Sequence, residues 1–254
     1  MAPKKGVVMK KLTFIIMVMC IGLAVAATSS FAEEKEKKAL SDEGEVSYVQ
    51  TDGNTKVTSL AAKNLAKYKF TERLLGSWKV GAVTAETSNV KTAESYNTDL
   101  KLDYQNTLRL YSFVNAGWEQ NKFAGVDEHV YGGAGLGYKF LDGPANFLVG
   151  ELGVMYVTDK YVDLAKDDYA GGRAFAKYIY AFTEKNKFSQ SLEYLNSFDD
   201  SENYKVNSET AVISALNSIF SLKAAYVVNY TNAPIPATLK KKDSITTVAL
   251  VVNY

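Results

Sequence analysis

The only histidine of the chain, His129, is the first residue to consider for catalysis. Lipid-degrading barrels place a serine beside a histidine and add a polar group that orients the imidazole ring. Val130 and Tyr131 follow His129, so no serine lies two residues later on the same face of a strand. The sequence therefore predicts no enzymatic activity, and we expect His129 either to be exposed or to lie at the rim.

Metal and phosphate chemistry has little support either. The one cysteine, Cys20, lies in an N-terminal apolar run, and His129 has no second histidine to share a metal ion. The acidic pairs at 167–168 and 199–200 offer oxygen ligands for calcium or for the cations around lipopolysaccharide, but such loop pairs are usually solvated. The glycine-rich stretch 132–137 precedes no helical pattern, so it indicates relief of crowding in a strand wall rather than a phosphate loop. We expect no cofactor and no bound metal.

Charged residues alternate with apolar ones along the strand-like segments. In residues 91–105, Leu100 and Leu102 fall on one face and Lys101 on the other, because successive side chains of a strand point to opposite faces. We expect the charged faces to point into an enclosed polar lumen. The residues assigned to this lumen are Asp99, Lys101, Asp103, Arg109, Glu119, Lys139, Glu151, Arg173, Lys177, Glu193, Lys205, Glu209 and Lys223.

These lumen charges are of mixed sign. A charge-selective pore favours a ring of one sign, so mixed charges indicate ion pairs that largely occlude a narrow lumen. The longest acidic loop is expected at Asp159–Tyr169, from where it could fold inward as a constriction.

The chain ends in an amphipathic hairpin. Its limbs span residues 221–230 and 244–254, and alternate residues of each limb are apolar. A final amphipathic strand that stops on an aromatic residue is typical of outer-membrane β-barrels. The C-terminal assembly signal is therefore assigned to Tyr254, Val252 and Leu250.

Turn signals divide residues 44–254 into about twelve strand-like segments. An even number of this size is usual for bacterial barrels. The turns near residues 68, 106, 142, 185 and 217 are short, and most of those near 90, 123, 162, 201 and 236 are longer. We predict an all-β fold, a transmembrane antiparallel up-and-down β-barrel of about 12 strands with short periplasmic turns and longer outer loops.

Aromatic residues gather at two levels of this predicted barrel. Amphipathic rings favour the two headgroup layers of a membrane. Near the short turns lie Tyr104, Tyr138, Phe140, Phe147, Phe182, Phe188 and Phe220, and near the long loops lie Trp78, Trp118, Tyr156 and Tyr230. We interpret the two groups as aromatic belts.

Residues 1–32 have the pattern of a cleavable secretory signal peptide, with Met1 or Met9 as its start. Two lysines at 10–11 precede the apolar run 12–27, and small residues precede the cleavage position after Ala32. The run is short for a membrane anchor of roughly 20 residues. The sequence therefore predicts export, a charged periplasmic leader at 33–43 and a barrel at 44–254 in the outer membrane of a Gram-negative bacterium.

Export also sets the charge and the expected partners. Loss of residues 1–32 removes four lysines, which moves the formal charge from +1 to −3 and leaves no basic footprint for nucleic acid. Cys20 is lost as well, so the mature chain has no thiol chemistry. The expected partners are outer-membrane lipid and lipopolysaccharide, together with the secretion and barrel-assembly machinery.

Several short motifs resemble one bacterial family. They are the opening stretch 44–55 with Ser59-Leu60, the glycine-rich stretch 133–140, and the closing hairpin with Pro234 and the run 241–243. Together they are similar to the salt-induced outer-membrane proteins, a family of unknown function. The resemblance implies an outer-membrane barrel and offers no site residues; this chain ends in tyrosine, where outer-membrane proteins more often end in phenylalanine.

Three functions remain open from the sequence. The first is a structural barrel for adaptation to salt stress, with a largely occluded polar lumen. The second is a small channel for ions or small solutes. The third is a soluble periplasmic barrel that binds an apolar ligand, in which the apolar faces would point inward.

Overall fold

The computed structural model describes residues 39–51, 57–88, 90–162 and 166–253. Within these residues the chain forms twelve strands and one short 3₁₀ helix, η1. Among them, no helix is long and apolar enough to cross a membrane. The elements are β1 (Leu40–Thr51), β2 (Val57–Lys69), β3 (Leu74–Thr87), β4 (Val90–Gln105), β5 (Leu110–Asn121), η1 (Lys122–Ala124), β6 (Val126–Asp142), β7 (Asn146–Tyr161), β8 (Lys166–Ala181), β9 (Asn186–Ser197), β10 (Tyr204–Ala215), β11 (Phe220–Thr231) and β12 (Lys242–Asn253).

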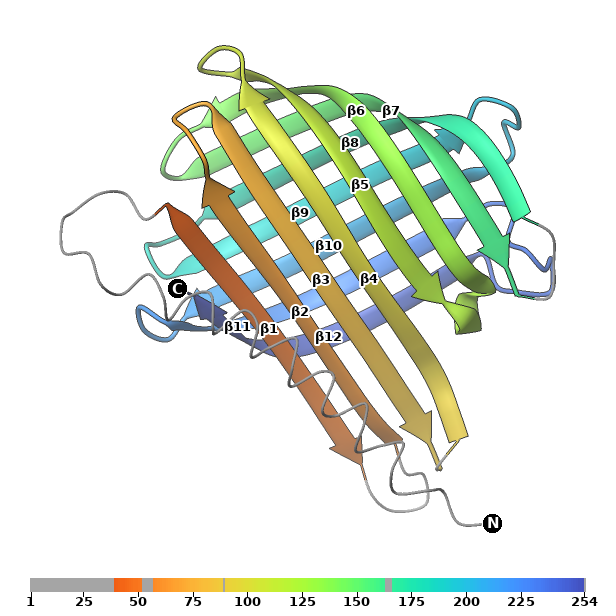
Figure 1. The fold of residues 1–254 in the computed structure, drawn as a ribbon. Coiled ribbons are helices and arrows are strands. Elements are labelled where there is room, and N and C mark those ends of the chain that lie inside the picture. The colour runs from red at the N-terminus through yellow and green to blue at the C-terminus, as the bar shows by residue number, and fades with distance from the viewer. Residues whose placement is uncertain (1–38, 52–56, 89, 163–165, 254) are drawn as a thin grey trace.

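The twelve strands form one closed barrel (Figure 1). Each strand pairs antiparallel with the next along the chain, and β1 pairs with β12 to close the ring. The predicted all-β antiparallel up-and-down barrel is confirmed. The expected signal peptide and residues 33–38 of the leader lie outside the described residues.

The strand boundaries correct two sequence predictions. β1 begins at Leu40, so the last residues of the expected leader already pair with β2 and belong to the wall. The loop expected at Asp159–Tyr169 is mostly strand, because β7 runs to Tyr161, β8 starts at Lys166, and Asp159 pairs with Asp167. Residues 159–161 and 166–169 thus belong to the barrel wall and not to an inward-folded loop, and residues 163–165 lie outside the described residues.

The two ends of the barrel differ in their connections. At one end, which we call the short-turn end, the strands are joined by residues 70–73, 106–109, 143–145, 182–185 and 216–219. The other end carries the longest connections, residues 198–203 and 232–241, and we call it the long-loop end. The link between β3 and β4 at this end is only residues 88–89, so the expected difference in length holds for some connections and not for all.

β7 shows which faces point outward. Leu152, with 71% of its surface exposed, and Val154 lie on the outer face, while Glu151, Met155 and Val157 are buried inside the barrel. The same apolar exterior continues on the neighbouring strands, where Leu136 and Leu192 are exposed. The third functional hypothesis, a soluble barrel with apolar faces inward, is therefore wrong.

Candidate functional site

The best-defined group of functional side chains is a chain of charges inside the barrel, which we call the charge ladder. Lys101 on β4 donates to Glu151 on β7 at 2.5 Å. Arg173 on β8 donates from Nη1 to Glu151 and from Nε to Glu193 on β9, both at 2.7 Å. Asn207 on β10 donates to the second oxygen of Glu193 at 3.1 Å. The ladder thus links five strands of the wall.

Glu151 is the centre of the ladder, with only 4% of its side chain exposed. A buried carboxylate is costly unless it is paired and hydrogen-bonded, and Glu151 also accepts from the Tyr111 hydroxyl at 2.6 Å. The cations are covered by rings: Lys101 Nζ lies 4.8 Å from the centre of Phe113, and the Arg173 guanidinium lies 5.0 Å from that of Phe175. Each cation therefore lies over an aromatic ring at a distance typical of a cation–π interaction.

Inward-facing glycines make room for the rings. A β-carbon on Gly137 would lie 2.1 Å from the Tyr111 ring, and one on Gly135 would lie 2.6 Å from Phe113. The predicted relief of crowding therefore occurs inside the lumen at these two positions. The sequence analysis missed the inward aromatic residues, although the alternate glycines of β6 were the signal for them.

A second group of charges lies beside the closure of the barrel. Lys223 on β11 donates to Glu45 on β1 at 2.6 Å and lies 3.0 Å from Glu209 on β10. Lys63 on β2 lies 3.7 Å from the other oxygen of Glu209. This group connects the last strands to the first two. Glu45 and Lys63 were not among the residues predicted from the sequence.

A third group surrounds Asp159, which is 0% exposed. His129 on β6 contacts its Oδ1, and Lys205 on β10 lies 3.4 Å from Oδ2. The hydroxyls of Tyr161 and Tyr169 each donate to Oδ2 at 3.3 Å. His129 is therefore buried in an ion-pair and hydrogen-bond network, so the expectation of an exposed side chain is wrong, although His129 lies near the long-loop end of β6.

Ser197 lines the same small cavity as His129, about 10 Å³ in volume. Its hydroxyl accepts from the backbone N–H groups of Asp199 and Asp200, at 3.1 and 3.3 Å. The described contacts of Ser197 therefore position the β9–β10 turn. Among the described residues, no group of three or more His, Cys, Asp or Glu side chains is arranged to hold a metal ion.

The other predicted lumen residues are more scattered. Asp99 accepts from the Tyr131 hydroxyl, and Asp103 lies 3.0 Å from Lys101. Lys139 lies 3.8 Å from Asp142 at the short-turn end. Glu119, opposite Asn97, and Lys177, opposite Ser191, hold inward strand positions. Arg109 lies outside the strands, in the exposed turn 106–109.

The interior is more open on one side. Side chains on β5 to β8 are packed, as in the cluster of Tyr111, Phe113 and Val149. On the opposite side, Lys63 and Lys79 keep 40% and 55% of their side chains exposed. The lumen therefore combines a packed half with a solvated half around β2 to β4.

Most of the expected belt residues lie on the outer surface. The exceptions are Phe147, which packs against the inner cluster around Phe113, and Trp78, which lies near the short-turn end of β3 instead of near the long loops. The other members either are exposed or lie at outward-facing positions: Tyr104, Tyr138, Phe140, Phe182, Phe188, Phe220, Trp118, Tyr156 and Tyr230. Leu250 is exposed and Val252 shares its face, while Tyr254 lies outside the described residues.

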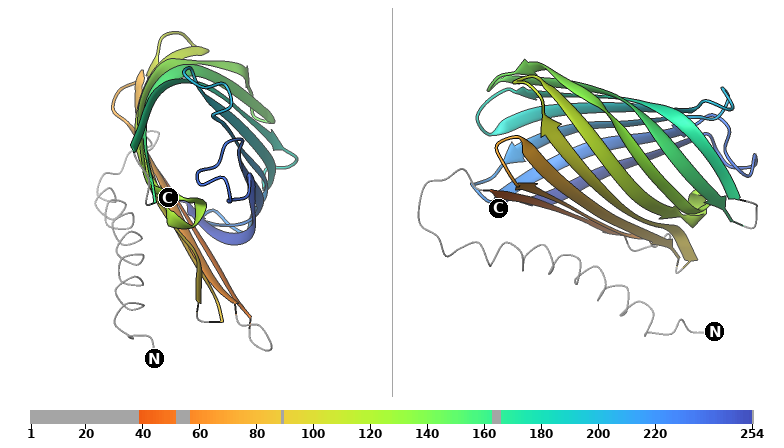
Figure 2. Two further views of the ribbon diagram at one scale, coloured as in Figure 1. Left: turned by 90° about the vertical axis from the view of Figure 1, so that its right-hand side faces the viewer. Right: turned by 45° about the horizontal axis from the view of Figure 1, so that its top comes forward.

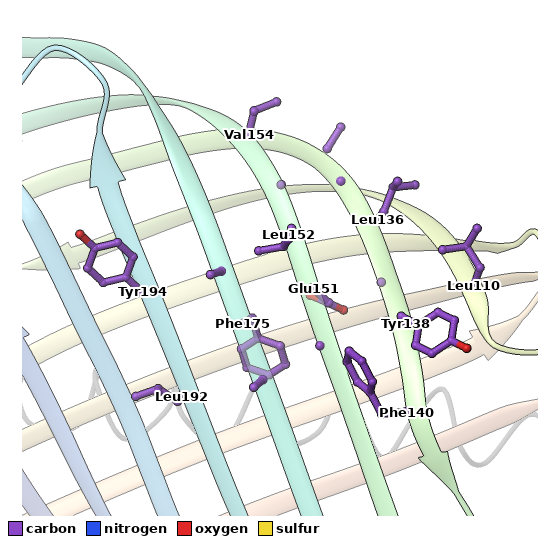
Figure 3. Close-up of a pocket in the computed structure, with 17 residues that line it drawn as sticks. Leu110, Leu136, Tyr138, Phe140, Glu151, Leu152, Val154, Phe175, Leu192 and Tyr194 are labelled. Atoms are coloured by element: carbon purple, nitrogen blue, oxygen red, sulfur yellow. The ribbon is translucent and has the colours of Figure 1, made fainter.

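The outer face also carries a shallow apolar hollow of about 810 Å³ over β6 to β9 (Figure 3). Its floor is made by small residues such as Ala134, Gly150 and Ala174, and bulky residues such as Leu136 and Leu152 border it. Glu151 reaches it only from the inner side of β7. The hollow is part of the apolar exterior, separate from the charge ladder.

The family model described as "Protein of unknown function, DUF481" matches residues 44–254. The chain belongs to this family. The protein YdiY of Escherichia coli K12, described as uncharacterized, is 29% identical over 203 residues, which are 80% of this chain and 79% of YdiY. The function of the DUF481 family is unknown, and this member of it folds as a closed twelve-stranded barrel with an apolar exterior.

Solved structures give the same fold. An outer membrane channel from Pseudomonas putida F1 is similar with a TM-score of 0.54 and 12% identity, over 89% of this chain and 98% of the channel. The NanC porin covers 85% of this chain and 98% of its own length, with a TM-score of 0.48 and 6% identity. The likeness to the Pseudomonas putida channel shows that this DUF481 protein shares the fold of that outer membrane channel.

Arg173→Met tests the charge ladder. Removing one partner from a buried ion pair leaves the others without compensation, so we expect a loss of about 3–5 kcal/mol in the free energy of unfolding. Lys160→Met is the matched control, because Lys160 pairs with Asp127 at the exposed rim, 3.1 Å away, and solvent-exposed pairs contribute little to stability. Reversible urea titration in lipid vesicles measures both. Equal effects of the two substitutions would contradict the ladder.

Proposed function

We propose that the protein is a non-enzymatic envelope barrel whose polar lumen is closed to free diffusion along its axis. The observation that supports this proposal is the charge ladder from Lys101 through Glu151 and Arg173 to Glu193. Charge-assisted hydrogen bonds of this kind are short and strong. Held by five strands, they fix large side chains in the packed half of the lumen.

The biological role proposed here is adaptation of the outer membrane to salt stress. It rests on the motifs that resemble the salt-induced outer-membrane proteins, and on an interior held by buried ion pairs. Salt weakens exposed ion pairs strongly and buried pairs much less. An interior of this type remains closed when the external ionic strength rises.

The growth of a deletion strain tests this role. We expect the strain to grow more slowly than its parent in added NaCl, and to match the parent in sucrose of equal osmolarity, because the proposed stress is ionic. A plasmid copy of the gene should restore growth. Equal growth of the two strains in NaCl would exclude a role in salt adaptation.

A narrow ion conduit is the second candidate. The observation that favours it is the solvated half of the lumen, where Lys63, Lys79 and Asp99 remain partly exposed. Charges of both signs line this side, so such a conduit would select weakly between cations and anions.

Planar-bilayer recording distinguishes the closed barrel from the conduit. The wild-type protein, folded as judged by its shift on heating, should give no stable open steps in concentrated KCl. Glu151→Gln removes the charge shared by Lys101 and Arg173, and should produce open steps because the ladder loses its centre.

Glu184→Gln is the matched control, since Glu184 is exposed in a turn at the short-turn end and should leave the closed state unchanged. Stable open steps in the wild-type protein would overturn the closed lumen and favour the conduit.

A further inference from the structure

The apolar hollow over β6 to β9 is a recess in the outer wall of the barrel. Its volume is about 810 Å³, and small residues such as Ala174 and Ala176 form its floor. Figure 3 shows Leu152, Leu192 and the ring of Tyr194 around it. An empty recess would deprive these side chains of dispersion contacts. The hollow therefore fits an apolar chain that fills it.

Three tyrosines lead from the border of the hollow toward the long-loop end, and we call them the tyrosine row. The ring of Tyr194 on β9 lies 5.9 Å from that of Tyr204 on β10, which lies 6.1 Å from that of Tyr230 on β11, measured between ring centres. The ring planes of these pairs are inclined by 37° and 33°. Tyrosine rings favour the headgroup level of a membrane, because they are apolar with one polar tip. The row therefore suits the polar part of a lipid whose chain fills the hollow.

The tyrosine row ends at Lys240, Lys241 and Lys242, which we call the lysine cluster. Tyr230 pairs with Lys242, the first residue of β12, and all three lysines are exposed. The side-chain oxygen of Asn232 accepts from the Tyr230 hydroxyl and from Lys241 Nζ, both at 3.1 Å. Asn232 thus joins the end of the row to the lysine cluster.

The β11–β12 loop, residues 232–241, is folded inward over the mouth of the barrel (Figure 2). Gly125, which follows η1 with φ 81°, approaches this loop so closely that a β-carbon there would lie 2.8 Å from Leu239. Because the loop lies over the mouth, it leaves Lys242 exposed at the start of β12. A ligand on the outer face can therefore reach the lysine cluster.

The charges of this rim place an anionic group at β12 and not above the hollow. Asp199 and Asp200 are exposed in the β9–β10 turn, next to the strand that borders the hollow. Glu202 accepts from Asn232 at 2.9 Å, and Asp243 follows the lysine cluster. Among the described residues at this place, three lysines face these two carboxylates, which leaves a positive charge for a phosphate.

The width of the surface favours a broad lipid. From β9 to β12 the tyrosine row and the lysine cluster span three strand spacings, or roughly 14 Å. A glycerophospholipid carries its phosphate directly above its chains, whereas a phosphorylated disaccharide with several acyl chains separates the two. A second copy of the barrel fits poorly, because a two-fold contact would set two identical hollows face to face and leave a void.

We propose that the hollow, the tyrosine row and the lysine cluster form one binding site for an acylated, phosphorylated disaccharide, the lipid A part of lipopolysaccharide. One acyl chain fills the hollow, the sugars lie along the tyrosine row, and a phosphate meets the lysine cluster. In this proposal the long-loop end faces the outside of the cell, as is usual for outer-membrane barrels. The inference goes beyond the proposed function and is independent of it, because the site lies on the outer face and the charge ladder lies in the lumen.

Native mass spectrometry of the folded protein in detergent tests the site. The protein is titrated with bisphosphorylated lipid A, and the bound molecules are counted. We expect saturable binding of one lipid A per barrel. Lipid A without phosphates and phosphatidylglycerol should each bind at least roughly tenfold more weakly, because the first lacks the charge and the second lacks the width.

Filling the hollow provides the decisive comparison. Ala176→Phe places a ring on the floor of the hollow and should abolish the saturable binding of lipid A. Ala116→Phe is the matched control, because Ala116 is also an exposed alanine of the outer face but lies on β5, opposite Leu100. It should leave the binding intact. Heat-modifiable mobility on a gel shows that each variant is folded.

The lysine cluster is tested by a second pair of variants. Lys241→Gln with Lys242→Gln should weaken the binding of lipid A at least roughly tenfold. Lys160→Gln with Lys166→Gln removes the same charge from exposed residues of β7 and β8, and should have little effect. Equal binding in either test variant and its control, or phosphatidylglycerol that binds as tightly as lipid A, would overturn the proposal. A dimer of the lipid-free protein that Ala176→Phe dissociates would also overturn it.

Discussion

The hydrocarbon core of a membrane offers no hydrogen-bond partner to a peptide group, so each strand that crosses it must pair on both sides. Twelve antiparallel strands meet this requirement by closing into a ring. The ring in turn fixes the two faces: Leu152 and its neighbours meet lipid, and Glu151 and its neighbours meet one another.

The interior depends on how mixed charges are buried in a narrow space. Ion pairs alone contribute little to stability once the cost of removing water is included. In this barrel the carboxylate of Glu151 gains a tyrosine hydroxyl, and Lys101 and Arg173 gain aromatic faces. Glycines at 135 and 137 provide the space for these rings. The buried charges therefore depend on the aromatic rings that cover them, and the rings depend on the glycines that make room for them.

The period-two pattern of the sequence was sufficient to predict the barrel, its strand count and, on β7, which face is polar. Contacts between distant strands were not predictable from that pattern, because the partner of a charge such as Asp159 depends on barrel tilt and width. For the same reason, the burial of His129 against Asp159 was not predicted. A loop was expected at Asp159–Tyr169 because acidic residues are usually solvent-exposed. Here Asp159 and Asp167 are instead paired strand residues of β7 and β8.

A scan of spin labels along β7 tests the alternation most directly. Single cysteines at positions 151–156 carry the label in turn, in lipid vesicles, and the relaxation by oxygen and by a water-soluble nickel complex is measured at each. The account predicts high oxygen accessibility at 152, 154 and 156, and low oxygen accessibility at 151, 153 and 155. The opposite phase, or no alternation at all, would contradict a barrel with an apolar exterior and a charged interior.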